Sequence, residues 1–144
     1  MAELTGQYLV TVRRSIAASA EELFDAWLDA DMLAQFMRPG GMARASVSCD
    51  PREGGAFEII MHGDDSSYRH TGHYLTIERP RKLVFSWISA ATAERESLVT
   101  VDFIAGSAAT DIVVTHRQLP DEAAQLSHTE GWGDVLDVLA ALFP

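Results

Sequence analysis

Residues 131–143, Gly-Trp-Gly-Asp-Val-Leu-Asp-Val-Leu-Ala-Ala-Leu-Phe, form the stretch that decides the fold. Its large apolar side chains recur at steps of three and four residues, which places them on one face of an α-helix: Trp132, Val135, Leu136, Leu139, Leu142 and Phe143. Burying a side chain of this kind contributes a gross free energy of about 1.5–3 kcal/mol. A helix with this much apolar surface has to pack against another layer of the structure.

Two glycines, Gly131 and Gly133, flank Trp132, and each is unfavourable inside a helix by about 1 kcal/mol. Leu119-Pro120-Asp121-Glu122 carries acidic residues where a helix N-terminus favours them, which predicts that the last helix starts there. In that case the glycines serve close packing or a local bend. A helix that begins near Trp132 explains them equally well.

The composition bounds the class of protein. The chain has 144 residues of which 47% are apolar, enough for one continuous core, so we interpret residues 1–144 as a single domain. The net charge of −10 argues against a nucleic-acid partner and against an anionic membrane surface. The chain starts without a basic region followed by an apolar run and contains no window of about 20 apolar residues, so we expect a cytoplasmic protein.

The first half of the chain predicts one strand and two short helices. Tyr8 to Ile16 alternates and is rich in β-branched residues, which is typical of a strand. Ser19-Ala20-Glu21-Glu22 is a capping box that starts a helix, and Asp29 or Asp31 can cap a second one over Met32–Met37.

The rest of the chain, up to the last helix, predicts a meander of hairpins. Turn-forming segments such as Asp50-Pro51-Arg52-Glu53-Gly54-Gly55 and Arg79-Pro80-Arg81 separate six alternating stretches. The expected strands are Ala43–Cys49, Gly55–His62, Ser67–Glu78, Lys82–Ser89, Glu96–Ala105 and Thr110–Gln118. One face of this sheet is apolar, so it can receive the last helix. The single cysteine, Cys49, has no partner for a disulfide or a zinc site, and we expect a structural thiol on a strand.

Several local strings resemble one protein family in order and spacing. They include Ala26-Trp27-Leu28-Asp29, Gly72-His73-Tyr74-Leu75-Thr76-Ile77, Leu83-Val84-Phe85-Ser86-Trp87 and His128-Thr129-Glu130-Gly131-Trp132. From about Tyr8 to Leu142 the chain resembles the bacterial homologues of the C-terminal domain of the activator of the ATPase of the 90-kDa heat-shock chaperone. That family belongs to the START and birch-pollen-allergen (SRPBCC) superfamily. The resemblance implies an α+β helix-grip fold: a curved seven-stranded antiparallel sheet wraps a long C-terminal helix, with two short helices between strands 1 and 2.

The resemblance also implies a hollow between sheet and helix that holds an apolar ligand. Residues on the apolar faces of the expected elements would line it, unless they simply pack as core: Trp27, Phe36, Phe57, Ile59, Met61, Trp87, Val101, Phe103, Val114, His116, Trp132 and Leu136. The family often has paired tryptophans where this chain has Phe36-Met37, a change that falls in the short helices that commonly close one end of the hollow.

The histidines do not form a metal or catalytic constellation. His70 and His73 lie three apart on one predicted strand and point to opposite faces, and His128 lies in a polar segment that predicts solvent exposure. Only His116 falls at an apolar strand position, where a buried, hydrogen-bonded histidine is favoured over a catalytic base. We therefore nominate no catalytic residue, metal or cofactor.

Three functions follow from these observations. The first is a cytoplasmic protein that binds a hydrophobic or aromatic small molecule. The second is an interaction module for a chaperone or another protein, although the chain has no counterpart of the separate N-terminal domain of the eukaryotic activator. The third is a cyclase or hydrolase, which requires an acid and a base facing one pocket. The pattern is compatible with a monomer or a homodimer.

Overall fold

The computed structural model describes residues 8–144 and contains a seven-stranded antiparallel sheet. The strand order across the sheet is β1-β7-β6-β5-β4-β3-β2, so β2 to β7 lie beside their neighbours in sequence and β1 pairs out of sequence with β7. The strands are β1 (Tyr8–Ile16), β2 (Arg44–Cys49), β3 (Ala56–His62), β4 (Ser67–Glu78), β5 (Lys82–Trp87), β6 (Ser97–Ala105) and β7 (Thr110–Leu119). The predicted α+β helix-grip fold is confirmed.

Two short helices connect β1 to β2, as predicted. Helix α1 (Ala20–Ala26) begins with the capping box, in which Ser19 Oγ accepts from the Glu22 amide and the Glu22 carboxylate accepts from the Ser19 amide. Helix α2 (Ala30–Phe36) starts two residues earlier than predicted, because Asp29 caps it by accepting from the amides of Asp31 and Met32. Two single-turn helices, η2 (Pro39–Gly41) and η3 (Ala90–Thr92), lie in the connections.

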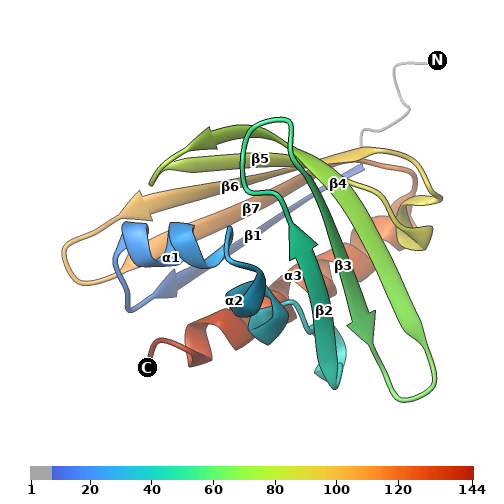
Figure 1. Cartoon of the computed structure of the whole chain (residues 1–144), viewed down its shortest axis with the longest axis horizontal. Helices are drawn as coiled ribbons and strands as arrows, with labels where there is room; N and C mark the ends of the chain where they lie inside the picture. Colours follow the sequence, from blue (N-terminus) through green and yellow to red (C-terminus); the bar gives the residue numbers. More distant parts are fainter. Residues whose placement is uncertain (1–7) are drawn as a thin grey trace.

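The C-terminal helix α3 (Glu122–Ala141) is continuous and has Asp121 as its N-cap. The interpretation in which the helix begins near Trp132 is therefore wrong. Figure 1 shows α3 crossing the concave side of the sheet, with α2 beside it. A Cβ built on Gly133 would lie 3.3 Å from the guanidinium of Arg14 on β1, so this glycine permits a close approach of helix and edge strand. Within residues 8–144, no helix is long and apolar enough to cross a membrane.

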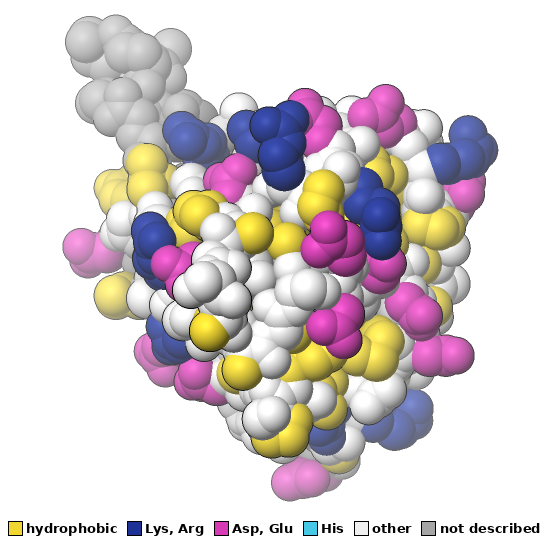
Figure 2. Space-filling view, turned by 90° about the vertical axis from the view of Figure 1, so that its left-hand side faces the viewer, with side chains coloured by type: hydrophobic (Ala, Val, Ile, Leu, Met, Phe, Trp, Pro, Cys, Tyr) yellow, Lys and Arg dark blue, Asp and Glu magenta, His cyan; other side chains and the backbone are white. Residues whose placement is uncertain are grey.

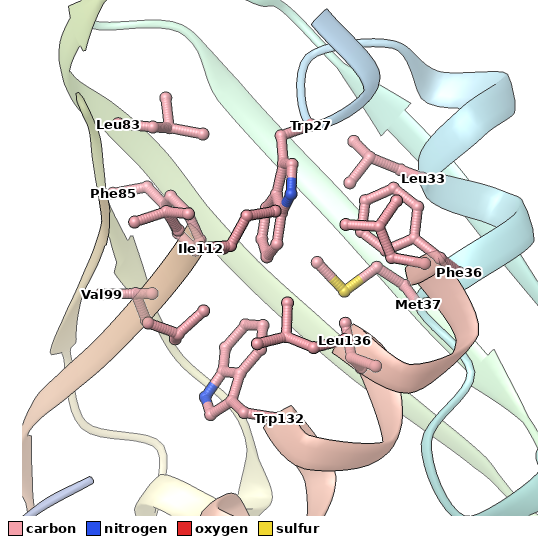
Figure 3. Packing of buried hydrophobic residues seen from close by; sticks show 14 of the residues in the cluster. Trp27, Leu33, Phe36, Met37, Leu83, Phe85, Val99, Ile112, Trp132 and Leu136 are labelled. Atoms are coloured by element: carbon pink, nitrogen blue, oxygen red, sulfur yellow. The ribbon is translucent and has the colours of Figure 1, made fainter. Parts of the chain in front are cut away.

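The core fills the space between the sheet and the three α-helices. In Figure 3 Trp27, at the end of α1, lies between Phe36 of α2 and Trp132 of α3. The ring of Trp27 is stacked on Trp132 at 6.2 Å between centroids and lies 5.2 Å from Phe36. Phe36 and Met37, which stand where the family often has paired tryptophans, are fully buried and complete the core between α2 and the sheet.

Strand β4 carries the curvature of the sheet because its two halves have different partners. Residues 67–73 pair with β3, whereas Tyr74 to Glu78 pair with β5. Gly72 lies where the partners change, and a Cβ built on it would lie 1.9 Å from the carbonyl oxygen of Ser86 and 2.6 Å from the ring of Phe57. Only glycine fits at this position, because neither the backbone nor the enclosed ring can move away.

We therefore expect Gly72→Ala to lower the free energy of unfolding by about 3 kcal/mol or more, through overpacking against backbone. Gly131→Ala is the matched control, because its Cβ would meet nothing closer than Pro39 Cβ at 3.9 Å. The control should be neutral or stabilising by up to about 1 kcal/mol, since alanine is the better helix former. Urea denaturation of both variants measures the difference. Equal stability of the two variants would contradict this account of the bend in β4.

Candidate functional site

A mainly apolar cavity lies between α3 and the ends of β3, β4 and β5, and it has a volume of about 400 Å³. The η2 and η3 turns close its sides. Its lining is mainly apolar, with polar side chains at a few points: Pro39, Met42, Met61, Ser67, Tyr68, Arg69, His70, Trp87, Ser89, Ala90, Ala91, Glu94, Ser127, His128, Gly131, Trp132 and Val135. Small residues such as Gly131, Ala90 and Ala91 leave the volume open.

Aromatic rings form the inner wall of this cavity. Trp87 is central, with ring centroids 5.2 Å from Trp132 and 4.9 Å from His70. Behind these rings, His116 packs edge-on against Trp87 and, at 4.7 Å, against His128. A wall of indole and imidazole faces offers stacking contacts to a flat ligand.

His116 is fully buried and takes part in a hydrogen-bond chain that fixes its tautomer. The indole N–H of Trp132 donates to His116 Nδ1 at 3.0 Å, so Nδ1 carries no proton. In the neutral ring Nε2 then carries the hydrogen and donates to Ser97 Oγ at 2.7 Å, and the Ser97 hydroxyl donates to the carbonyl oxygen of Trp87 at 2.6 Å. The chain therefore connects α3 to β7, β6 and β5 and leaves neither ring nitrogen free for chemistry.

Burial, with a smaller contribution from the nearby His128, lowers the pKa of His116 to about 3. A neutral His116 is required, because a protonated Nδ1 could not accept from Trp132. His116 is buried and hydrogen-bonded in the core, as predicted.

Two other histidines, His70 of β4 and His128 of α3, line the cavity itself. His70 Nδ1 lies 3.4 Å from the carbonyl oxygen of Ile59, and His128 Nδ1 lies 2.7 Å from that of Ala124. Each Nδ1 must be the donor in these contacts, which leaves Nε2 as an acceptor in both rings. Burial lowers the pKa of both histidines, so both are neutral at neutral pH.

Two buried polar atoms of the cavity wall have no hydrogen-bond partner within residues 8–144: the indole nitrogen of Trp87 and the hydroxyl of Ser89. An unsatisfied buried polar group costs about 1–3 kcal/mol, so such atoms are uncommon in a plain core. A third unpartnered atom, Trp27 Nε1, belongs to a separate void of about 10 Å³ bounded by Phe57 and Tyr74. That void is at most the size of one water molecule.

Charged groups occur only near the rim of the cavity. Arg69 lines it and forms an ion pair with Glu58 at 2.5 Å, and Glu94 follows η3. Both partners of the ion pair are well exposed, so its contribution to stability is small. Within the described part of the chain, no group of three or more His, Cys, Asp or Glu side chains is placed to hold a metal ion.

The structure brings three of the twelve nominated residues to the cavity: Met61, Trp87 and Trp132. Four of the twelve border the small void, Trp87 among them: Trp27, Phe57, Ile59 and Trp87. The others are buried in the core away from both spaces: Phe36, Val101, Phe103, Val114, His116 and Leu136. A ligand-binding role for any of them remains a prediction.

Sequence reasoning missed the two cavity histidines. It predicted His128 to face solvent, which is wrong, because only 8% of the residue is exposed. The sequence did contain a signal for its burial. When the helix starts at Glu122, His128 lies four residues before Trp132 and therefore on the same, buried face of the helix. His70 was correctly expected to face away from His73, and it is the buried member of that pair.

The curved antiparallel sheet that packs around the C-terminal helix α3 defines a helix-grip protein. The chain belongs to the family described as Activator of Hsp90 ATPase homolog 1-like protein, whose sequence profile matches residues 17–144.

Solved structures share this fold. Protein CV1439 from Chromobacterium violaceum has a TM-score of 0.81 at 22% identity, over 94% of this chain and 96% of its own. Protein Ms6760 from Mycobacterium smegmatis has a TM-score of 0.76 at 17% identity, over 96% of this chain and 91% of its own. CalU16 from Micromonospora echinospora has a TM-score of 0.70 at 23% identity, over 92% of this chain and 73% of its own. No curated protein matches the chain.

The buried histidines predict acid sensitivity. In the unfolded chain His116 takes up a proton below its ordinary pKa of 6.5, whereas in the folded protein it stays neutral down to about 3. The folded pKa is lowered, so the free energy of unfolding falls as the pH decreases through this window, by at most about 1.4 kcal/mol per pH unit for this group.

His116→Gln removes that titration while keeping an acceptor for Trp132 and a donor for Ser97. We expect its unfolding free energy to fall less steeply with decreasing pH than that of the wild type, by about 1 kcal/mol per pH unit. Urea denaturation at a series of pH values between about 7 and 5 measures both slopes. Parallel slopes would show that His116 does not carry the effect.

Proposed function

We propose that this protein binds an apolar, aromatic small molecule in the cavity between α3 and the sheet. The observation that carries the proposal is the mainly apolar cavity of about 400 Å³ whose wall combines the rings of Trp87 and Trp132 with the imidazoles of His70 and His128. Ligand sites in proteins have volumes of roughly 300–1,000 Å³, an apolar lining and a few placed polar groups. The cavity has all three properties.

The shape of the wall supports an aromatic ligand. The faces of Trp87 and Trp132 are tilted by 51° to each other, and the ring of His70 lies against Trp87. Aromatic pairs at such distances contribute about 0.5–1.5 kcal/mol beyond the buried area. A planar ring system can therefore contact several faces at once.

A protein-interaction module would require a continuous exposed apolar patch. The large exposed apolar side chains of residues 8–144 are instead spread over β1, β4, β6 and α3: Tyr8, Leu9, Tyr68, Leu75, Ile104 and Leu126. On the face shown in Figure 2, acidic, basic and apolar side chains are interspersed. This distribution favours ligand binding in the cavity over an exposed docking surface.

A cavity-filling variant tests the proposal without removing a core contact. Gly131 lines the cavity and lies inside α3, so Gly131→Leu adds volume there and also improves helix propensity. We expect it to weaken binding of a planar aromatic compound by about tenfold or more while the unfolding free energy is kept or raised. Gly131→Ala is the control, since one methyl group leaves most of the cavity open.

Native mass spectrometry of the protein as purified, followed by calorimetric titration with a panel of aromatic compounds and fatty acids, provides the ligand and its affinity. A co-purifying mass or saturable binding that Gly131→Leu abolishes is the expected result. Absence of any binding across the panel, or equal binding by Gly131→Leu and wild type, would refute the proposal. Binding of a chaperone middle domain instead would support the protein-interaction alternative.

A further inference from the structure

The cavity wall contains a pair of imidazoles that a purely apolar ligand would not use. His70 enters from β4 and His128 from α3, and each has its Nδ1 held by a backbone carbonyl oxygen. The residues are only 9% and 8% exposed, and both line the same cavity. Their Nε2 atoms are therefore two acceptors on the wall of one apolar space.

This arrangement sets the chemistry that the pair can recognise. A neutral imidazole whose Nδ1–H is already donated can only accept at Nε2. It attracts a hydroxyl or N–H hydrogen of a ligand and offers nothing to an ether or carbonyl oxygen. A carboxylate is also disfavoured, because the cation at the rim, Arg69, is already paired with Glu58.

The neighbouring Trp87 adds an aromatic face beside the imidazole acceptor. Its ring lies 4.9 Å from that of His70. A hydroxyl group on an aromatic ring donates the hydrogen that the imidazole accepts while the ring itself packs against the indole. Among simple polar substituents of an aromatic ring, a phenolic hydroxyl matches this set of groups.

We propose that the cavity selects aromatic compounds that carry a hydroxyl group, and that one of the two wall histidines, His70 or His128, makes the selection by accepting the hydroxyl hydrogen at its Nε2. This inference rests on the proposed ligand-binding function and adds the class of ligand. A site built to pair with a hydroxyl discriminates against an analogue without it, because the buried acceptors are then left without a partner.

The test compares two probes of the same ring system, 2-naphthol and 2-methoxynaphthalene, by calorimetric titration. The ether keeps the acceptor oxygen and the ring but has lost the donor hydrogen. We expect the wild type to bind the naphthol about tenfold or more tightly than the ether. In the double variant His70→Phe/His128→Phe, which keeps two aromatic rings in the wall, this preference should disappear while the ether still binds within about threefold of its wild-type affinity.

His73→Phe is the matched control, because it changes a histidine of the same strand whose side chain lies on the opposite, exposed face. It should keep the wild-type preference. If the double variant does not fold, the two single variants replace it, and each should reduce the preference.

The outcomes separate this inference from the proposed function. Equal affinity of the wild type for both probes, or a preference that persists in the histidine variants, overturns the inference and leaves the proposed function standing. Failure of both probes to bind the wild type overturns both.

Discussion

The hydrogen bond from the Trp132 indole to His116 is the constraint on which the rest of the site depends. Helix α3 contacts the sheet mainly through apolar side chains, which are non-directional and by themselves allow the helix to rotate or slide. One buried donor that must meet one buried acceptor removes this freedom, because an unpaired partner costs more than the bond gains. The Trp132–His116–Ser97–Trp87 chain therefore fixes the position of α3 relative to β5, β6 and β7.

The position of α3 in turn determines where the core is filled and where it is hollow. On one side of Trp132, the rings of Trp27 and Phe36 complete the packing against α1 and α2. On the other side, helix residues toward the N-terminus of α3 are small or polar, including Ser127 and Gly131, and the space opens into the cavity. The same residue that anchors the helix is thus also the boundary between core and site.

Much of the fold could be predicted from the sequence because its determinants are local. Turn residues and period-two alternation placed each strand to within about two residues, and the capping residue Ser19 marked the start of α1. The start of α2 was less certain from sequence because Asp29 and Asp31 are both capping residues, and the structure uses Asp29. The location of the cavity is not local. Apolar periodicity identifies which side chains face inward. Whether those side chains fill the space between the elements depends on the sum of their volumes, which no local pattern gives. Phe103 and Leu136 therefore have the same pattern as Met61 and Trp87, although the first two lie in the filled core and the last two line the cavity.

The buried polar side chains around the cavity lower the stability of the fold relative to apolar residues at the same positions. At the positions of His70 and His128, leucine or phenylalanine would gain burial without the cost of desolvating an imidazole. Trp87 and Ser89 likewise have buried polar atoms without a hydrogen-bond partner within residues 8–144. The fold, by contrast, pairs every polar atom of the neighbouring His116 ring with a short hydrogen bond. The paired atoms of His116 form a structural network, whereas the unpaired polar groups of the neighbouring cavity residues form a surface suited to a ligand. Under the proposed function, the cost of leaving the second set unpaired is offset when a ligand with matching groups is bound.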